Sequence, residues 1–272
     1  MNESLVKYLA GLLDADGSLS FECHRGYDDK VRIGLKLHLT SAESIDRDGF
    51  VVSLPTLTGF GSVNRYAMGD RFYTQWFVGH RADLEMLLPR IIKHMVVKAK
   101  HWQWLLDYWR VHRSQEKGQK CMTEVEWQLL SAASRDSRRT RVGPIKPKNH
   151  PTWAWVAGFL DGDGCYSFRT SRNNNMRLSV SAHVMDLSVL EFLQNSFGGT
   201  IKPNSHKPEV KVWWRGLGPS HTSFVLRFLP HLVKHSRLKK HKIEQMIHFH
   251  RQRLSASRVT GPCDSLNSQA AI

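Results

Sequence analysis

The chain has few cysteines, fewer acidic than basic residues, and no long hydrophobic run. Its 4 cysteines are scattered and form no C-x-x-C pair, which excludes the common zinc motifs and gives no disulfide framework. No apolar stretch is long enough to cross a bilayer, and the N-terminal residues reach acids before any signal-peptide cleavage pattern. We therefore expect a soluble, unsecreted protein with reduced thiols and no membrane partner.

Basic residues outnumber acidic residues in this chain. The 272 residues include 39 Lys and Arg against 24 Asp and Glu, which gives a formal net charge of +15. Such an excess indicates a positive surface that attracts polyanions, with nucleic acid a better candidate than a membrane. On charge alone, a generically basic soluble protein stays open as the alternative.

The sequence is an internal repeat. YLAGLLDADGSLSF (8–21) recurs as WVAGFLDGDGCYSF (155–168), so that Asp14 aligns with Asp161. Later segments match in the same order: 31–41 with 176–186, 74–78 with 212–216 through Trp76 and Trp214, and 87–101 with 228–242. Each half therefore carries the same parts in the same order.

Hydrophobic periodicity predicts what those parts are. Residues 31–39 and 176–184 alternate, with one apolar face and one basic or polar face, as in a strand that is buried on one side. Further strands are expected at 18–25, 61–66, 71–78, 165–172, 200–203 and 209–215, and helices at 43–57, 80–112, 186–196 and 220–252. Each half then reads helix, two strands, helix, two strands, helices, an α/β (α+β) unit of αββαββα order.

The repeat also predicts the domain organisation. Residues 1–111 and 152–254 form the two halves, joined by a basic linker over 112–151. Thr123 and Glu126 form a capping box for one linker helix that ends near Ser134. Residues 255–272 are expected to be a flexible tail.

Small residues precede the acids of each motif helix by one turn. Gly11 and Gly158 each cost about 1 kcal/mol relative to alanine in a helix, so we expect another helix backbone to approach there. The obvious partner is the other copy, which would bring Asp16 and Asp163 together at two helix C-termini. Carboxylates are unfavourable at that end of a helix, and a bound divalent cation removes the penalty.

The spacing of the acids does not fit an EF-hand calcium loop. Such a loop with Gly17 at its sixth position would need ligands at Leu12 and Cys23, which neither residue supplies. Solvated acids at a helix end stay open as an alternative to a metal site, although the D-x-D-G ending occurs twice at matched positions.

The motifs LAGLLDADG (9–17) and VAGFLDGDG (156–164) carry a resemblance to a known family. The chain resembles the LAGLIDADG homing endonucleases in their single-chain, two-motif (monomeric) form, over roughly 1–110 and 152–252. The resemblance implies two pseudo-twofold-related half-domains, with the motif helices at their interface and antiparallel, saddle-shaped sheets over DNA. It also implies metal-dependent cleavage of both strands of a long asymmetric DNA target.

The resemblance further implies a metal site. Asp16 and Asp163 match the metal-binding acids, with the carbonyls of Ala15 and Gly162 as additional ligands. The expected ion is Mg²⁺; Mn²⁺ would substitute, and Ca²⁺ would support binding without efficient cleavage. Such ions activate water and stabilise the leaving oxygen in phosphodiester hydrolysis.

Other catalytic positions follow from the same resemblance. Lys98 and Lys239 match the basic residues near the scissile phosphates. Ser41 and Asp186 fall where the family often places a water-organising Gln, so this sequence departs from the pattern there.

Outward strand residues are expected to contact DNA, either at base edges or at phosphates. For the first half these are Ser20, Glu22, His24, Arg32, Lys36, His38, Tyr73 and Gln75. For the second half they are Ser167, Arg169, Arg172, Arg177, Ser181, His183, Lys211, Trp213 and Arg215. Because the two sets differ, we expect a target that is only weakly palindromic.

The resulting hypothesis is a monomeric, intron-encoded, site-specific double-strand DNA endonuclease with no obligate protein partner. An RNA-splicing maturase and a catalytically inactive DNA-binding protein on the same scaffold stay open as alternatives. The target sequence and the compartment, bacterial cytoplasm or an organelle, are not specified by the sequence.

Overall fold

The computed structural model describes residues 1–25, 31–46, 48–113, 123–139, 151–169, 175–183, 187–216 and 222–259. The first half contains α1 (Glu3–Ala15), β1 (Ser18–Arg25), β2 (Val31–Ala42), α2 (Phe50–Thr58), β3 (Ser62–Met68), β4 (Arg71–Val78), α3 (Arg81–Ile92) and α4 (Ala99–Arg113). After α5 (Glu124–Arg139), the second half contains α6 (Trp153–Gly162), β5 (Gly164–Arg169), β6 (Asn175–His183), α7 (Leu187–Phe197), β7 (Thr200–Pro203), β8 (Val210–Gly216), α8 (Thr222–His235) and α9 (Lys240–Val259). The predicted order of helices and strands is confirmed in both halves. Within the described ranges, no helix is long and apolar enough to cross a membrane.

Each half is built on one antiparallel sheet, with strand orders β1-β2-β4-β3 and β5-β6-β8-β7. One face of each sheet is covered by helices, and the other, the open face, carries polar side chains. In β2, Leu35, Leu37 and Leu39 are buried on the covered face while Lys36 and His38 alternate with them. The predicted period-two pattern is therefore confirmed, and it places the basic residues on the open face.

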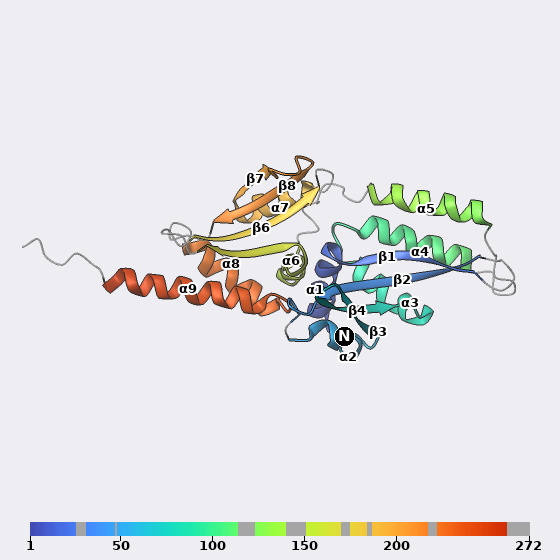
Figure 1. The fold of residues 1–272 in the computed structure, drawn as a ribbon, viewed down its shortest axis with the longest axis horizontal. Coiled ribbons are helices and arrows are strands. Elements are labelled where there is room, and N and C mark those ends of the chain that lie inside the picture. Colours follow the sequence, from blue (N-terminus) through green and yellow to red (C-terminus); the bar gives the residue numbers. More distant parts are fainter. Residues whose placement is uncertain are drawn as a thin grey trace, which may run out of the picture.

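The two halves meet through their motif helices, α1 and α6, which lie side by side at the centre of the elongated molecule (Figure 1). A Cβ atom added to Gly11 would lie 2.0 Å from the Trp155 carbonyl oxygen, and one added to Gly158 would lie 2.0 Å from that of Tyr8. Only glycine, which has no Cβ atom, lets the two helix backbones come this close, so their predicted close approach is confirmed. The two contacts are related by the pseudo-twofold symmetry of the repeat.

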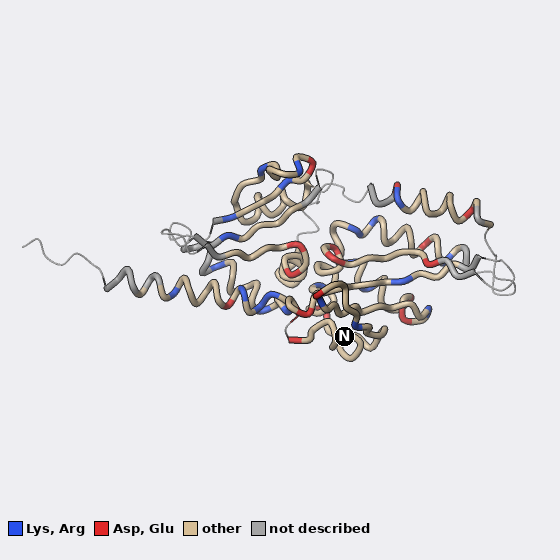
Figure 2. The backbone as a smooth tube through the Cα atoms, viewed as in Figure 1, with Lys and Arg blue, Asp and Glu red and all other residues tan. Residues whose placement is uncertain are grey.

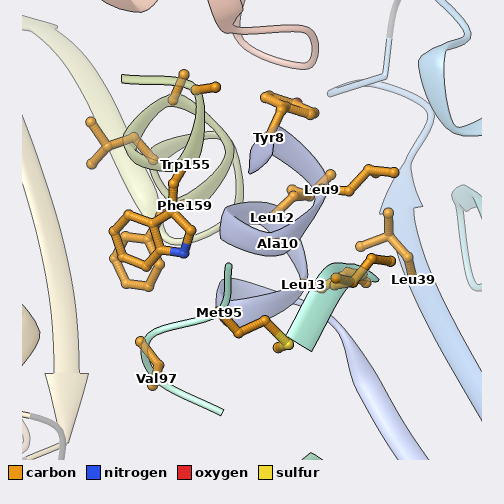
Figure 3. Close-up of a cluster of buried hydrophobic side chains, with 14 of the residues drawn as sticks. Tyr8, Leu9, Ala10, Leu12, Leu13, Leu39, Met95, Val97, Trp155 and Phe159 are labelled. Atoms are coloured by element: carbon orange, nitrogen blue, oxygen red, sulfur yellow. The ribbon is translucent and has the colours of Figure 1, made fainter. Parts of the chain in front are cut away.

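Apolar side chains fill the space around this helix pair (Figure 3). Leu9, Leu12 and Leu13 of α1 are fully buried, and the rings of Trp155 and Phe159 stack with centroids 5.1 Å apart. Burying each such side chain contributes about 1.5–3 kcal/mol. The interface is therefore part of a continuous core rather than a surface contact between two finished domains.

Several helix boundaries differ from the sequence-based expectation. The segments 80–112 and 220–252 are each two helices, α3 and α4, and α8 and α9, separated by turns at 93–98 and 236–239. Helix α2 starts at Phe50 instead of 43, because Gly49 adopts a left-handed conformation (φ 66°) and the Asp46 carboxylate accepts hydrogen bonds from the Phe50 and Val51 backbone N–H groups. Helix α5 keeps the predicted Thr123–Glu126 capping box but continues to Arg139. Helix α9 continues to Val259, into the segment predicted to be a tail.

The predicted alignment of the last strands was wrong by one residue. Trp76 donates from Nε1 to the Phe60 carbonyl at 3.0 Å, and Trp213, not Trp214, makes the equivalent bond to the Gly198 carbonyl at 2.9 Å. Both indoles are fully buried. Trp214, beside Trp213 in β8, therefore lies on the open face, where Phe77 lies in the first half.

Candidate active site

The second acid of each motif ends its helix. Asp16 and Asp163 are the C-caps of α1 and α6, and both are exposed. Because the helices run parallel, their acidic ends meet at the centre of the molecule, as Figure 2 shows. A Cβ atom at Gly162 would lie 3.1 Å from Oδ2 of Asp16, so the end of α6 lies directly against the Asp16 carboxylate. The structure therefore brings the two predicted acids to one place.

The first acid of each motif has a different environment, which the sequence did not reveal. Asp14 is buried and accepts hydrogen bonds from the backbone N–H groups of Val96 and Lys98 at 2.6 and 2.8 Å. It also accepts from Nε1 of Trp155, in the opposite motif helix, at 2.9 Å. Asp14 thus joins α1 both to the turn before α4 and to α6.

Asp161 makes the pseudo-equivalent set of contacts. It accepts from the Tyr8 hydroxyl of α1 at 2.7 Å and from the Ser236 hydroxyl at 2.6 Å. Backbone N–H groups of the turn before α9, from Arg237 to Lys239, complete the set. Tyr8 and Trp155 occupy the same position in the two repeats, and this matched pair is the signal in the sequence that could have revealed the cross-helix bonds.

The two predicted catalytic lysines donate hydrogen bonds to backbone carbonyls at the C-terminal ends of the motif helices. Lys98 Nζ donates to the carbonyl oxygens of Leu13, Ala15 and Gly17 at 3.1, 2.8 and 2.8 Å. In the second copy, Lys239 Nζ donates to those of Leu160, Gly162 and Gly164 at 3.4, 2.7 and 2.6 Å. A positive charge at a helix C-terminus offsets the negative end of the helix dipole. Contact with a scissile phosphate stays a prediction for both lysines.

Desolvation shifts the proton equilibria of this cluster. Asp16 is exposed at the surface, but the helix ends packed around it partly desolvate its carboxylate and raise the pKa above the ordinary 3.8, while the neighbouring charges of Lys239 and Lys98 oppose the shift. Burial also lowers the pKa of Lys239, opposed by the carboxylates of Asp161, Asp16 and Asp163. A divalent cation beside Asp16 would favour its ionised form in the same way as the lysines do.

The oxygen atoms at the two helix ends fit a hard divalent cation. Asp16 and Asp163 supply carboxylates, and the Ala15 and Gly162 carbonyls each keep a lone pair besides the one that accepts from a lysine. In the described part of the chain, no three His, Cys, Asp or Glu side chains gather as a metal site. The remaining ligands would have to be water and substrate oxygens, which Mg²⁺ commonly retains.

Ser41 does not reach this site. Its side chain is 8% exposed and lies on the covered face of β2, paired in register with buried Thr74. The prediction that Ser41 organises a catalytic water is therefore wrong, because the strand alternation turns it toward the helices. Asp186 lies outside the described residues. On the open face beside Ser41, Gln75 donates from Nε2 to the Thr40 hydroxyl at 3.1 Å.

The open face of the first sheet carries six of the eight DNA-contacting side chains predicted for the first half. Those placed there by strand register are Ser20, Glu22, Lys36, His38, Tyr73 and Gln75. Lys36 pairs with Glu22 at 3.0 Å and lies over the Phe77 ring. The side chains of His24 and Arg32 lie outside the described residues.

The second sheet differs from the prediction at three positions. Ser167, Arg177 and Ser181 share the open face, but Lys211, Trp213 and Arg215 pair with Ala182, Val180 and Leu178 and so lie on the covered face. Their predicted orientation was wrong because the adjacent tryptophans allowed two alignments. The side chains of Arg169 and His183, and the whole of Arg172, lie outside the described residues. Trp214 and Lys202 are two open-face residues that the prediction missed.

Comparison with known sequences matches this architecture. Residues 156–250 match the family model described as LAGLIDADG endonuclease. The chain is 37% identical over 57 residues to the probable intron-encoded endonuclease aI2 of Debaryomyces hansenii, a match that covers 21% of this chain and only 8% of that protein. It is 20% identical over 193 residues to the probable intron-encoded endonuclease aI3 of Dictyostelium citrinum, covering 70% of this chain and 74% of the relative.

Solved structures share the fold along nearly the whole chain. I-SmaMI bound to cleaved DNA superposes with a TM-score of 0.68 at 18% identity, covering 96% of this chain and 92% of that one. I-SmaMI bound to an uncleaved DNA target with calcium ions gives 0.68 at 18% identity, with 96% and 94% covered. The I-GzeII complex with its DNA target, described as a LAGLIDADG homing endonuclease, gives 0.71 at 16% identity, with 94% and 92% covered.

Proposed function

We propose that this chain, a two-motif member of the LAGLIDADG endonuclease family, is a metal-dependent, site-specific nuclease that cuts both strands of a long asymmetric DNA target. One observation carries the proposal: two exposed carboxylates, Asp16 and Asp163, end parallel helices whose backbones touch. A pair of acids on a pseudo-twofold axis suits a reaction carried out once on each strand of a duplex. The net charge of +15 supplies the attraction for DNA.

In this proposal Asp16 and Asp163 hold divalent ions, with help from the carbonyls of Ala15 and Gly162. The bound metal, expected to be Mg²⁺, supplies an activated water and charge stabilisation at the scissile phosphate. Asp14 and Asp161 fix the two helix ends relative to each other through Trp155 and Tyr8. The protein's own contribution is therefore a rigid pair of acids with little freedom to rearrange during the reaction.

The two halves would read the target separately. Residues 1–111 and 152–254 each present one open sheet face to one half-site, and 112–151 connects them within a single chain. Because the two open faces differ in charge and in aromatic residues, the half-sites should differ in sequence. The molecule would then work as a monomer with an internal pseudo-dimer.

The test begins with a randomised duplex library incubated with the protein and Mg²⁺, followed by sequencing of the cut ends. Asp16→Asn and Asp163→Asn should each abolish double-strand cleavage of the selected target while leaving binding in Ca²⁺ largely intact. Asp107→Asn is the matched control, because this acid is exposed on α4 and takes no part in the cluster. Wild-type cutting rates in either motif variant would contradict the assignment.

A further inference from the structure

Trp214 stands on the open face of the second sheet with two cations over its ring. The guanidinium carbon of Arg177 lies 4.6 Å from a ring centroid, and Lys202 Nζ lies 5.3 Å from it. Strand β8 runs between β6 and β7, so the two cations reach Trp214 from opposite neighbouring strands. We refer to Arg177, Trp214 and Lys202 as the tryptophan clamp.

The first sheet carries a related pair, but with a different charge balance. Strand register makes the positions equivalent, because Phe77 pairs with His38 and Trp214 with Ser179, two residues after Lys36 and Arg177. Lys36 lies 5.1 Å from the Phe77 ring centroid and also forms an ion pair with Glu22 at 3.0 Å. Among the described residues, no carboxylate pairs with Arg177 or Lys202. The clamp therefore presents positive charge that is not neutralised within the described part of the protein.

The clamp lies close to the catalytic acids. Trp214 is in register with Ser179, and Ser179 with Cys165, two residues after Asp163. Neighbouring strands are about 4.8 Å apart, so the ring lies about 10 Å across the sheet from the start of β5. At a rise of about 3.4 Å per base pair, this distance corresponds to base pairs near the cut.

We propose that Trp214 is a positioning residue that orients the Arg177 guanidinium for bidentate hydrogen bonding to one guanine in the half-site read by the second sheet. The inference rests on the proposed function, since it assigns one base contact of that DNA complex. A guanidinium stacked on an aromatic plane keeps its edge N–H donors available, and the guanine O6 and N7 in the major groove match that fork. Lys202, on the neighbouring strand β7, also lies over the ring.

The experiment measures base preference in Ca²⁺ by selecting bound duplexes from a randomised library. Arg177→Ala should lower the preference for guanine at one position roughly 5- to 150-fold. Replacing the ring in Trp214→Leu should lower the same preference roughly 2- to 5-fold, whereas Trp214→Phe should retain most of it. In the Arg177→Ala background, Trp214→Leu should cause no further loss, because Trp214 acts through Arg177.

Phe77→Leu is the matched control, because it removes the equivalent ring of the other sheet and should leave this guanine preference unchanged. Thermal unfolding of each variant checks that the fold is kept. An unchanged preference in Trp214→Leu would overturn the proposal, as would an equal loss in both Arg177 backgrounds, which would mean that the ring contacts DNA by itself. Equal weakening of all sequences by Arg177→Ala would indicate a phosphate contact and would also overturn it.

Cleavage of the selected duplexes in Mg²⁺ separates the two proposals. Absence of cleavage with the guanine preference intact would reject the nuclease and leave the clamp supported. Cleavage with a guanine preference that is insensitive to Trp214→Leu would reject the clamp alone. Failure to enrich any sequence would overturn both.

Discussion

Gly11→Ala tests how far the activity depends on contact between the motif helices. The added Cβ would lie 2.0 Å from the Trp155 carbonyl oxygen and 2.9 Å from the Phe159 nitrogen, both of them backbone atoms of α6. Neither atom can rotate away as a side chain would. The two helices must therefore separate by about 1 Å, and a gap of that size forfeits a quarter to a half of each contact across it.

The expected magnitude combines two opposing effects. Alanine gains about 1 kcal/mol of helix propensity over glycine. Overpacking of a tight core typically costs about 1–3 kcal/mol. The separation also loosens the packing of Leu12 and Phe159, which are buried beside Gly11; losing a quarter of roughly 100 atom contacts, each about 0.1 kcal/mol, adds roughly 2 kcal/mol. We expect a net destabilisation of about 2–4 kcal/mol and a Tm lowered by roughly 5–15 °C. Because Asp16 lies against the end of α6, cleavage should fall further than DNA binding.

Urea unfolding and cleavage assays on the same preparation give both quantities. Gly79→Ala is the matched control: the nearest atom to its added Cβ is 3.8 Å away, at Lys36, so its stability should stay within about 0.5 kcal/mol of wild type. If Gly11→Ala were as stable as wild type, or more stable as propensity alone predicts, the proposed role of the helix contact would be refuted.

Other predictions concern charge and hydrogen bonding. DNA binding should weaken with salt with a log–log slope near −0.9 for each neutralised phosphate, and a flat titration would argue against nucleic acid as the partner. Desolvation by the surrounding helix ends raises the pKa of Asp16 above 3.8, so on acidification this carboxylate takes up its proton at a higher pH than an ordinary Asp. Ca²⁺ affinity, measured by titration calorimetry, should therefore begin to fall at a higher pH than for an ordinary Asp, and Asp16→Asn should remove this early part of the pH dependence. Tyr8→Phe removes one donor to Asp161 and should cost about 1.5–3 kcal/mol in urea unfolding. Lys98→Met should lower stability and also reduce the salt slope of DNA binding by about one, as the predicted phosphate contact requires; an unchanged slope would limit Lys98 to its bonds with the helix-end carbonyls.

The sequence predicted those features of the fold that neighbouring residues determine, such as the strand alternation and the positions of the motif-helix glycines. The alternation of 31–39 follows from one buried sheet face, and the glycines of the motif helices indicated a close backbone approach that the structure contains. Strand β8 shows where such patterns are insufficient. Adjacent tryptophans at 213 and 214 satisfy the alternation in either register, and it is the tertiary structure that distinguishes them, through the burial of Trp213 and its hydrogen bond to Gly198.

The candidate site was predictable only in part, because many of its contacts join residues that lie far apart in the sequence. A repeated acid at a helix end is visible in the sequence, so Asp16 and Asp163 could be identified. The partners of Asp14 lie 82 and 141 residues away, at Val96 and Trp155, and no spacing rule connects them. Similarly, nothing in the sequence shows that the Lys98 ammonium turns back to the carbonyls of its own half.

The helix period explains why the two acids of one motif have separate roles. Residues two apart on a helix point about 200° from each other, so Asp14 faces the turn before α4 while Asp16 faces outward.

The charges at the C-terminal ends of α1 and α6 do not balance. Four carboxylates, two from each helix, lie there with the ammonium groups of Lys98 and Lys239. With all of these groups ionised, two negative charges remain, beside two helix C-termini that add partial negative charge of their own. This balance favours one divalent cation before any phosphate arrives, and each DNA phosphate that enters the site raises the demand for positive charge. In the proposed function, charge alone would therefore link metal binding at Asp16 and Asp163 to DNA binding.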